Sequence, residues 1–169
     1  MTARRQGVAI AVGAVLAVLL QVMVAPSITL FGAQPNILAV YALVVAVTCP
    51  YPAGSPLPFV LGLLYDLLGT GPVGGMALVL VVVSFAASNV LEQIDERTAP
   101  LSLLVFLLSV LLVESLYGIL LIALGFPVGI GAALVYRALP CTLYDGVVGL
   151  LFYPLMARLL RGADRVKEA

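Results

Sequence analysis

Residues 99–124 read APLSLLVFLLSVLLVESLYGILLIAL and contain one ionisable side chain, Glu114. A helix needs about 20 predominantly apolar residues to cross the hydrocarbon core of a bilayer. This stretch therefore predicts a transmembrane helix.

The rest of the chain has the same character. Hydrophobic residues make up 63% of the 169 residues and charged residues 9%, and the mean hydropathy is +1.23. A soluble domain is about 25% charged, and a soluble fold of this size leaves roughly a third of its unfolded surface in contact with water. The solvent around this chain must therefore be lipid. We predict an all-α, polytopic integral membrane helical bundle that forms a single membrane domain over residues 1–169.

Six apolar segments end at proline, glycine or charge. They span residues 8–25, 36–49, 57–68, 76–91, 99–124 and 132–160. The second and third are too short for a straight span. Either they extend through Pro35 and through Ser55 and Pro56, or they are partial helices, which lipid tolerates only where protein or a water-filled cavity satisfies the free backbone groups. The sequence predicts about six transmembrane segments, some short or broken.

Basic residues collect at three places, before the first segment, in the linker 92–98, and at the end of the chain. With six spans, all of these places fall on one side of the membrane, as the positive-inside rule requires of the cytoplasmic side. We therefore expect both termini to be cytoplasmic. The residues are Arg4, Arg5, Arg97, Arg158, Arg161, Arg165 and Lys167.

Composition also excludes several functions. The formal net charge is zero and histidine is absent, so the chain lacks the basic stripe of a nucleic-acid-binding surface. Because histidine is absent, histidine-ligated metals and Ser-His chemistry are also excluded, whereas sites made of carboxylates alone stay possible. Cys49 and Cys141 lie in or beside apolar runs, where a cysteine is a small buried hydrophobe. We expect no metal and no cofactor.

Four ionisable residues interrupt the apolar segments: Asp66, Glu114, Arg137 and Asp145. Such residues cost a few kcal/mol in lipid and usually face the bundle interior. We take them as a candidate intramembrane polar cluster with a binding role. Arg137 is its only cation and lies on nearly the same helix face as Asp145, and we expect it to pair with Glu114 or Asp66. The alternative is structural pairing that serves no transport or chemistry.

Small residues recur at four-residue spacing in two segments. Ala9, Gly13 and Ala17 form one stripe, and Ser84 and Ser88 form another. Stripes of this kind let helix backbones approach closely. They indicate internal packing or, less often, a partner site.

Two short motifs carry less information. The triplet Leu-Tyr-Asp occurs at 64–66 and at 143–145, as an inverted repeat would require, but no wider match surrounds it and we interpret it as chance. The glycine-rich residues 69–75 predict a tight turn outside the bilayer. They lack the Lys-Ser/Thr ending of a phosphate-binding loop, which argues against a phosphate site.

A series of turn and helix-start residues resembles the rod shape-determining protein MreD family. It comprises Gln21 and Pro26, the run Gly32-Ala33-Gln34-Pro35-Asn36, the run Gly62-Leu63-Leu64-Tyr65-Asp66, and Gly69 to Gly74 with Pro72. The resemblance covers most of the chain and is sharpest from Gln21 to about Leu78.

This resemblance implies a non-enzymatic component of the bacterial cell-elongation (rod) complex in the cytoplasmic membrane. It implies binding to an MreC-like single-span membrane protein. Through that partner it implies association with the MreB filament, RodA and a class B penicillin-binding protein, in support of cell shape and lateral peptidoglycan synthesis.

Two other functions fit a small polytopic protein. The first is the substrate-binding subunit of an energy-coupling-factor-type transporter, which a polar pocket near Asp66, Arg137 and residues 26–35 would favour. The second is an intramembrane aspartic protease. Its two carboxylates would have to share a proton at a few ångströms, whereas the expected helices separate Asp66 and Asp145 in depth by about 15 Å.

Overall fold

The computed structural model describes residues 3–29, 34–49, 55–94, 98–126 and 139–161. Within these ranges the chain forms six α-helices and one 3-10 turn, and no strand. This confirms the predicted all-α fold. The elements are α1 (Ala3–Met23), η1 (Ala25–Ile28), α2 (Ile37–Thr48), α3 (Leu57–Leu68), α4 (Gly75–Glu92), α5 (Ala99–Ala123) and α6 (Leu139–Arg161).

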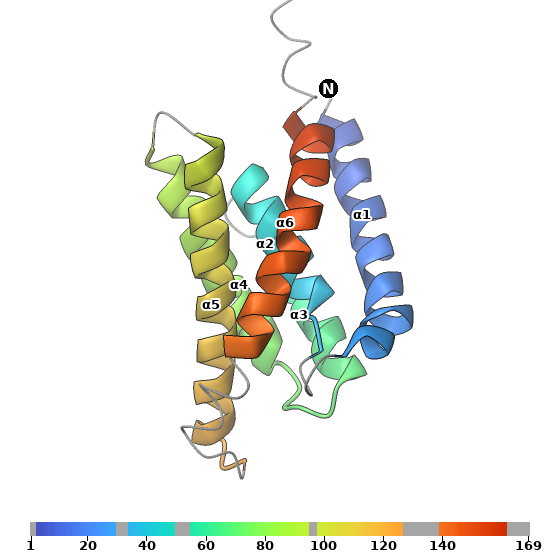
Figure 1. The fold of residues 1–169 in the computed structure, drawn as a ribbon, viewed down its shortest axis with the longest axis vertical. Helices are drawn as coiled ribbons and strands as arrows, with labels where there is room; N and C mark the ends of the chain where they lie inside the picture. The colour runs from blue at the N-terminus through green and yellow to red at the C-terminus, as the bar shows by residue number, and fades with distance from the viewer. Residues whose placement is uncertain (1–2, 30–33, 50–54, 95–97, 127–138, 162–169) are drawn as a thin grey trace, which may run out of the picture.

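The helices alternate in direction. The beginning of α1 and the final turns of α4 and α6 lie at one end of the bundle (Figure 1). The end of α1, η1 and the turn between α3 and α4 lie at the other end (Figure 1). The helix ends next to the basic residues are therefore grouped at one end of the molecule, as an even number of crossings requires.

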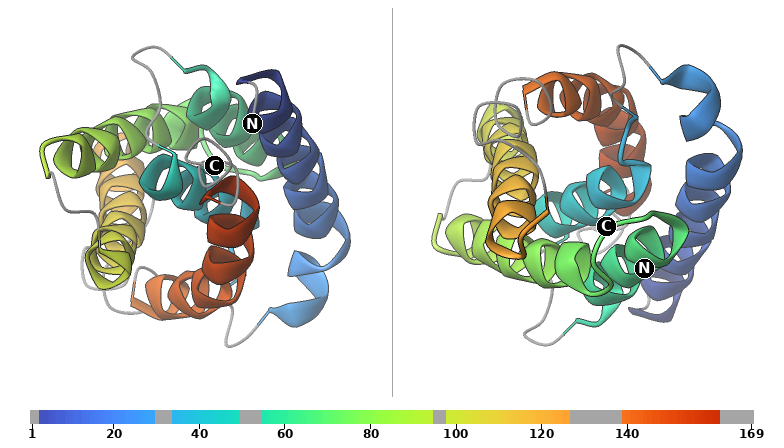
Figure 2. Two further views of the ribbon diagram at one scale, coloured as in Figure 1. Left: turned by 90° about the horizontal axis from the view of Figure 1, so that it is seen from above. Right: turned by 90° about the horizontal axis from the view of Figure 1, so that it is seen from below.

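Helix α2 is the centre of the bundle. All twelve of its residues are buried, and it contacts α1, α3, α4, α5 and α6, which surround it in both views of Figure 2. Twelve residues of α-helix measure about 18 Å, less than the roughly 30 Å thickness of the hydrocarbon core. Of the two structures expected for the short second segment, the chain adopts the partial helix sheltered by its neighbours.

The third segment is also a short helix. α3 contains 12 residues and begins at Leu57, directly after Pro56. Gly62 of α3 brings it close to α4, since a Cβ at this position would lie 2.5 Å from the Ala77 Cα. Any side chain at residue 62 would therefore push the two backbones apart.

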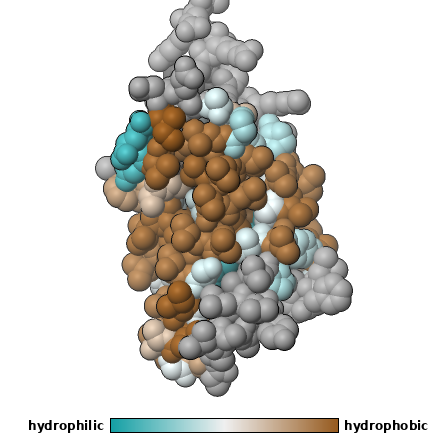
Figure 3. Space-filling model, turned by 60° about the vertical axis from the view of Figure 1, so that its left-hand side comes forward, coloured by the Kyte–Doolittle hydropathy of each residue, from teal (hydrophilic) through white to brown (hydrophobic). Residues whose placement is uncertain are grey.

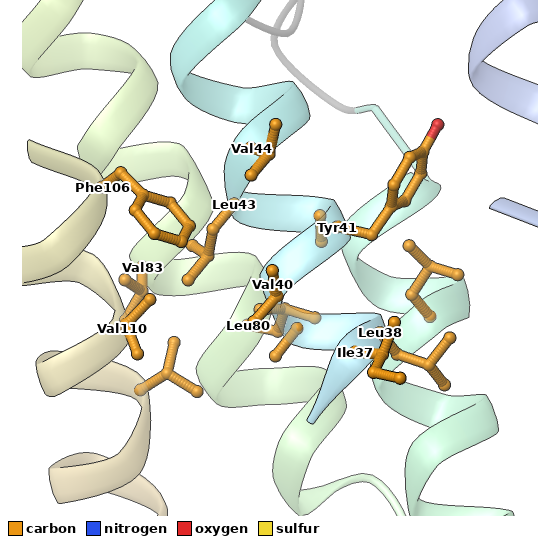
Figure 4. Packing of buried hydrophobic residues seen from close by; sticks show 14 of the residues in the cluster. Ile37, Leu38, Val40, Tyr41, Leu43, Val44, Leu80, Val83, Phe106 and Val110 are labelled. Atoms are coloured by element: carbon orange, nitrogen blue, oxygen red, sulfur yellow. The ribbon is translucent and has the colours of Figure 1, made fainter. Parts of the chain in front are cut away.

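Apolar side chains fill the space between α2 and its neighbours. Val40 and Leu43 of α2 point toward Phe106 and Val110 of α5 (Figure 4). From α4, Leu80 and Val83 join the same cluster. Close contact of this kind holds helices together in lipid, where the hydrophobic effect gives no net drive for association.

The two stripes of small residues face inward. On α1, Ala17 is buried and Gly13 lies against the Tyr41 side chain of α2. On α4, both serines are buried, and the Ser88 Oγ donates a hydrogen bond of 3.4 Å to the Ala46 carbonyl of α2. Both stripes therefore serve internal packing.

The outer surface of the bundle is apolar over its middle (Figure 3). Among the described residues, three helices are long and apolar enough to cross a membrane, over Gln6–Met23, Gly75–Glu92 and Ala99–Ala123. Exposed side chains such as Leu16 of α1, Val82 of α4 and Leu108 of α5 present this surface to the acyl chains.

Candidate functional site

Asp66 holds the beginning of α4. Its carboxylate accepts hydrogen bonds from the backbone N–H groups of Gly74 at 2.9 Å, Met76 at 3.0 Å and Ala77 at 3.2 Å. The side chain is 2% exposed. The first N–H groups of a helix have no partner within that helix, and the helix dipole favours an anion there. Asp66 therefore caps a neighbouring helix.

The turn before α4 makes this cap possible. Gly74 has φ +91, a left-handed conformation that costs glycine little. It reverses the chain so that the N–H groups of α4 point back at the end of α3. Residues 69–75 thus form the tight turn that their composition predicts.

Side chains from two neighbouring helices, α1 and α6, hold the beginning of α2. The Gln21 Oε1 of α1 accepts a hydrogen bond of 2.7 Å from the Ile37 N–H, and the Gln21 Nε2 donates to the Pro35 carbonyl at 3.2 Å. The Asp145 Oδ1 of α6 accepts from the Asn36 N–H at 2.7 Å. These bonds satisfy backbone groups that lipid could not.

Asn36 completes this arrangement as the N-cap of α2. Its Oδ1 accepts a hydrogen bond of 3.0 Å from the Ala39 N–H, the usual bond of a helix cap. Its Nδ2 lies 3.8 Å from the Met76 Sδ. Since Met76 also donates to Asp66, the beginnings of α2 and α4 are neighbours in one buried polar network.

The predicted cluster can now be located residue by residue. Asp145 is 1% exposed and Glu114 is 8% exposed, and the two carboxyl groups are close enough to interact electrostatically. Asp66 binds the Met76 N–H of α4, and the Met76 side chain lies against Asn36, whose N–H binds Asp145. Asp66 is thereby connected to Asp145. Arg137 lies outside the described residues, so its expected pairing with Glu114 or Asp66 stays a prediction.

Two neutral members of the network, Gln21 and Asn36, do not belong to the predicted polar cluster. Both are buried, at 5% and 2% exposed. In the sequence they are part of the family resemblance and carry no charge that marks them as interior polar residues. An amide directly before a long apolar run is a typical helix start, and this signal identifies Asn36 but gives no partner for Gln21.

The repeated triplet has a related role in both places. Asp66 binds the start of α4 and Asp145 the start of α2. However, the first triplet closes α3 and the second lies early in α6, so the two aspartates are not related positions of an inverted repeat.

Two clefts open at the end of the bundle opposite the beginning of α1. One has a volume of about 280 Å³ and lies between α1, η1 and α3. The other, of about 260 Å³, lies between α3, the turn at residues 69–71 and α5. Tyr65 and Gly69 line both, so the clefts are adjacent.

These features define a class of protein, a small polytopic helical membrane protein whose buried polar residues secure the beginnings of its helices. Within the residues that the structure describes, no group of three or more His, Cys, Asp or Glu side chains could hold a metal ion.

The chain belongs to the family of the rod shape-determining protein MreD, whose family model matches residues 3–163. Comparisons with curated proteins and with solved structures found no match. The chain is therefore a membrane component of the rod-shape machinery, in a family of shape-determining structural components and not of known enzymes.

Proposed function

We propose that this chain is a non-enzymatic scaffold of the rod complex in the cytoplasmic membrane that binds an MreC-like single-span protein. The family match over residues 3–163 carries this proposal. Through that partner the chain would join the MreB filament, RodA and a class B penicillin-binding protein, and so support cell shape and lateral peptidoglycan synthesis.

The architecture supports this function. The interior side chains Gln21, Asp66 and Asp145 are engaged in holding helices, and the lateral helix surfaces are open to a membrane partner. Of these, α1 offers most. Only 17% of the residues of Gln6–Met23 are buried, whereas nine of the 25 residues of α5 are buried. Helices in lipid associate through close packing, so we assign the partner helix to α1.

The test is affinity purification of the tagged chain in mild detergent. We expect to recover a single-span MreC-like protein together with the elongation synthases. In a strain that lacks the chain, cells should lose their rod shape, and the wild-type gene should restore it.

Two matched variants locate the binding surface. Leu16 and Leu19 of α1 are 52% and 50% exposed, and Leu108 and Leu112 of α5 are 52% and 50% exposed. Replacing the α1 pair with tryptophan should reduce partner recovery, and the same change in the α5 pair should not. Equal recovery from both would remove α1 as the interface.

Orientation needs its own experiment. We propose that both termini are cytoplasmic, because the helix ends flanked by arginine lie at one end of the bundle. Reporter tags on the two termini should both be active in the cytoplasm. A tag that is active only on the outer face would contradict this topology.

A transport subunit is a second candidate, favoured by the cleft lined by Pro26 and Gln34. Recovery of paired ATPases with the tagged chain, in place of a single-span protein, would support transport and exclude the scaffold.

A further inference from the structure

We propose that the two adjacent clefts bind a neutral, hydroxyl-rich ring such as a hexose. The clefts share Tyr65 and Gly69 and open at the end of the bundle that carries η1 and the turn between α3 and α4. This proposal depends on the lining of the clefts and is independent of membership in the rod complex.

The volumes limit the ligand to a small one. Pockets for drug-sized ligands measure roughly 300 to 1,000 Å³. The clefts, at about 280 and 260 Å³, are each slightly smaller than this range. A single sugar ring fits such a space, and a second ring could occupy the adjacent cleft.

The lining combines amides, a hydroxyl and aromatic rings. Gln34 and Thr70 are exposed and give the clefts an amide and a hydroxyl, which together both donate and accept hydrogen bonds. Tyr65, Tyr117 and Phe126 supply aromatic rings. A sugar has the complementary surface, because its C–H groups pack on an aromatic face while its hydroxyl groups bond to amides.

The charges of the lining favour a neutral ligand. Among the described residues that line the clefts there is no lysine or arginine. Asp66 belongs to the second cleft, but its oxygens accept hydrogen bonds from the beginning of α4. A phosphate or carboxylate would enter without a counter-charge, and such burial is costly.

The walls of the clefts are fixed before a ligand arrives. Gln21 is held by its bonds to Pro35 and Ile37, and Asp66 secures the end of the turn at Gly74. Binding to a rigid site costs less conformational entropy.

The test uses the full chain in phosphatidylcholine nanodiscs. In one arm, methyl β-glucoside is titrated and its contact with the protein is measured by saturation-transfer NMR. In the other, the nanodiscs contain a glucosyl diacylglycerol, and native mass spectrometry detects lipid that stays bound. Anionic phosphatidylglycerol serves as the competitor.

We expect saturable binding in at least one arm. Binding of the methyl glucoside alone identifies a soluble sugar, and binding of the glycolipid alone identifies a lipid headgroup. Gln34 lines one cleft and Thr70 the other, so the double variant Gln34→Leu with Thr70→Val removes one hydrogen bond from a ring in either cleft and should bind about fivefold more weakly.

The matched control is Gln93→Leu with Thr98→Val, which makes the same changes at exposed positions flanking the linker between α4 and α5. It should bind as the wild type does. The proposal is overturned by the absence of binding in both arms, by equal binding in the two double variants, or by preferential binding of phosphatidylglycerol.

Discussion

Helices α1 and α2 follow one another in an apolar sequence and yet have opposite surroundings. Only 17% of the residues of Gln6–Met23 in α1 are buried, whereas every residue of α2 is buried. In water, hydrophobicity separates an inner helix from an outer one. In lipid it does not, because acyl chains are as apolar as leucine.

Small and polar residues place these helices instead. On α1, Gly13, Ala17 and Gln21 recur every four residues, and all three are buried. At the start of α2 the Asn36 N–H donates a hydrogen bond to Asp145 of α6, and within α2 the Tyr41 hydroxyl donates one to the Ile10 carbonyl of α1. An inner helix in this bundle is therefore a helix whose beginning is bound by its neighbours.

Helix α4 is also bound at its beginning, by Asp66. We therefore expect the largest loss of stability from Asp66→Leu. The change leaves the N–H groups of Gly74, Met76 and Ala77 without their acceptor. One unsatisfied buried donor costs about 1–3 kcal/mol, and three donors are affected, so we expect a loss of about 3–5 kcal/mol. We expect thermal unfolding of the protein in detergent to show this loss, or folded protein to be absent from the membrane.

Two controls accompany this variant. Asp66→Asn keeps one acceptor oxygen and should lie between the wild type and Asp66→Leu. Glu92→Leu removes an exposed acid at the other end of α4 and should leave stability unchanged. If Asp66→Leu unfolds at the temperature of Glu92→Leu, the carboxylate does not secure α4.

The second prediction tests the link between α1 and α2 directly. Gln21→Leu removes the acceptor for the Ile37 N–H and the donor to the Pro35 carbonyl. Leaving a buried backbone group unsatisfied costs about 1–3 kcal/mol, so we expect a loss of about 2–3 kcal/mol. Hydrogen exchange in the first turn of α2 should rise, whereas exchange in the middle of α5 should not.

Gln21→Glu keeps the shape of this side chain. Protonated, it keeps the acceptor for Ile37 and a donor to the Pro35 carbonyl, so at low pH it should lose less stability than Gln21→Leu. Equal exchange at Ile37 in the wild type and in Gln21→Leu would show that α2 begins without help from α1.

Much of the fold could be predicted because it depends on local sequence. Length and hydropathy identify a helical membrane bundle, and the starts of α2, α3, α4 and α5 each lie within one residue of the predicted segments. Asn36 and the turn at residues 69–75 are also local signals. Even Asp66 could have been assigned to α4, because its partners lie only 8 to 11 residues ahead.

The central position of α2 could not be predicted in this way. Its beginning is held by Asp145, which is 109 residues distant from Asn36 in sequence. A single sequence contains no signal that pairs them, and in lipid a buried apolar helix has the composition of an exposed one. The role of Gln21 could not be predicted for the same reason, because this neutral side chain binds the Ile37 N–H of another helix.

The third prediction concerns how closely α1 and α2 approach. At Gly13, an added side chain would meet the Tyr41 ring, with its Cβ 2.8 Å from the Tyr41 Cζ. Overpacking of a tight contact costs about 1–3 kcal/mol, and we expect about 2 kcal/mol for Gly13→Leu in thermal unfolding. Val12→Leu, at a side chain that is 54% exposed, should change stability by less than about 0.5 kcal/mol.

The smallest effect is a coupling between Gly13 and Tyr41. The Tyr41 hydroxyl donates a hydrogen bond of 2.7 Å to the Ile10 carbonyl of α1, and it is the atom nearest to a Cβ at Gly13. Tyr41→Phe should cost about 1 kcal/mol through the lost bond. It also vacates the space that Gly13→Ala would need.

A double-mutant cycle measures this coupling between Gly13 of α1 and Tyr41 of α2. Gly13→Ala should destabilise the wild type more than it destabilises Tyr41→Phe, by about 0.5–1 kcal/mol, because contacting residues are not additive. The same cycle with Leu16→Ala, at a lipid-facing position of α1, should be additive. Additivity at Gly13 as well would mean that α1 does not lie against Tyr41, and that α2 is held in the centre by α6 and its other neighbours alone.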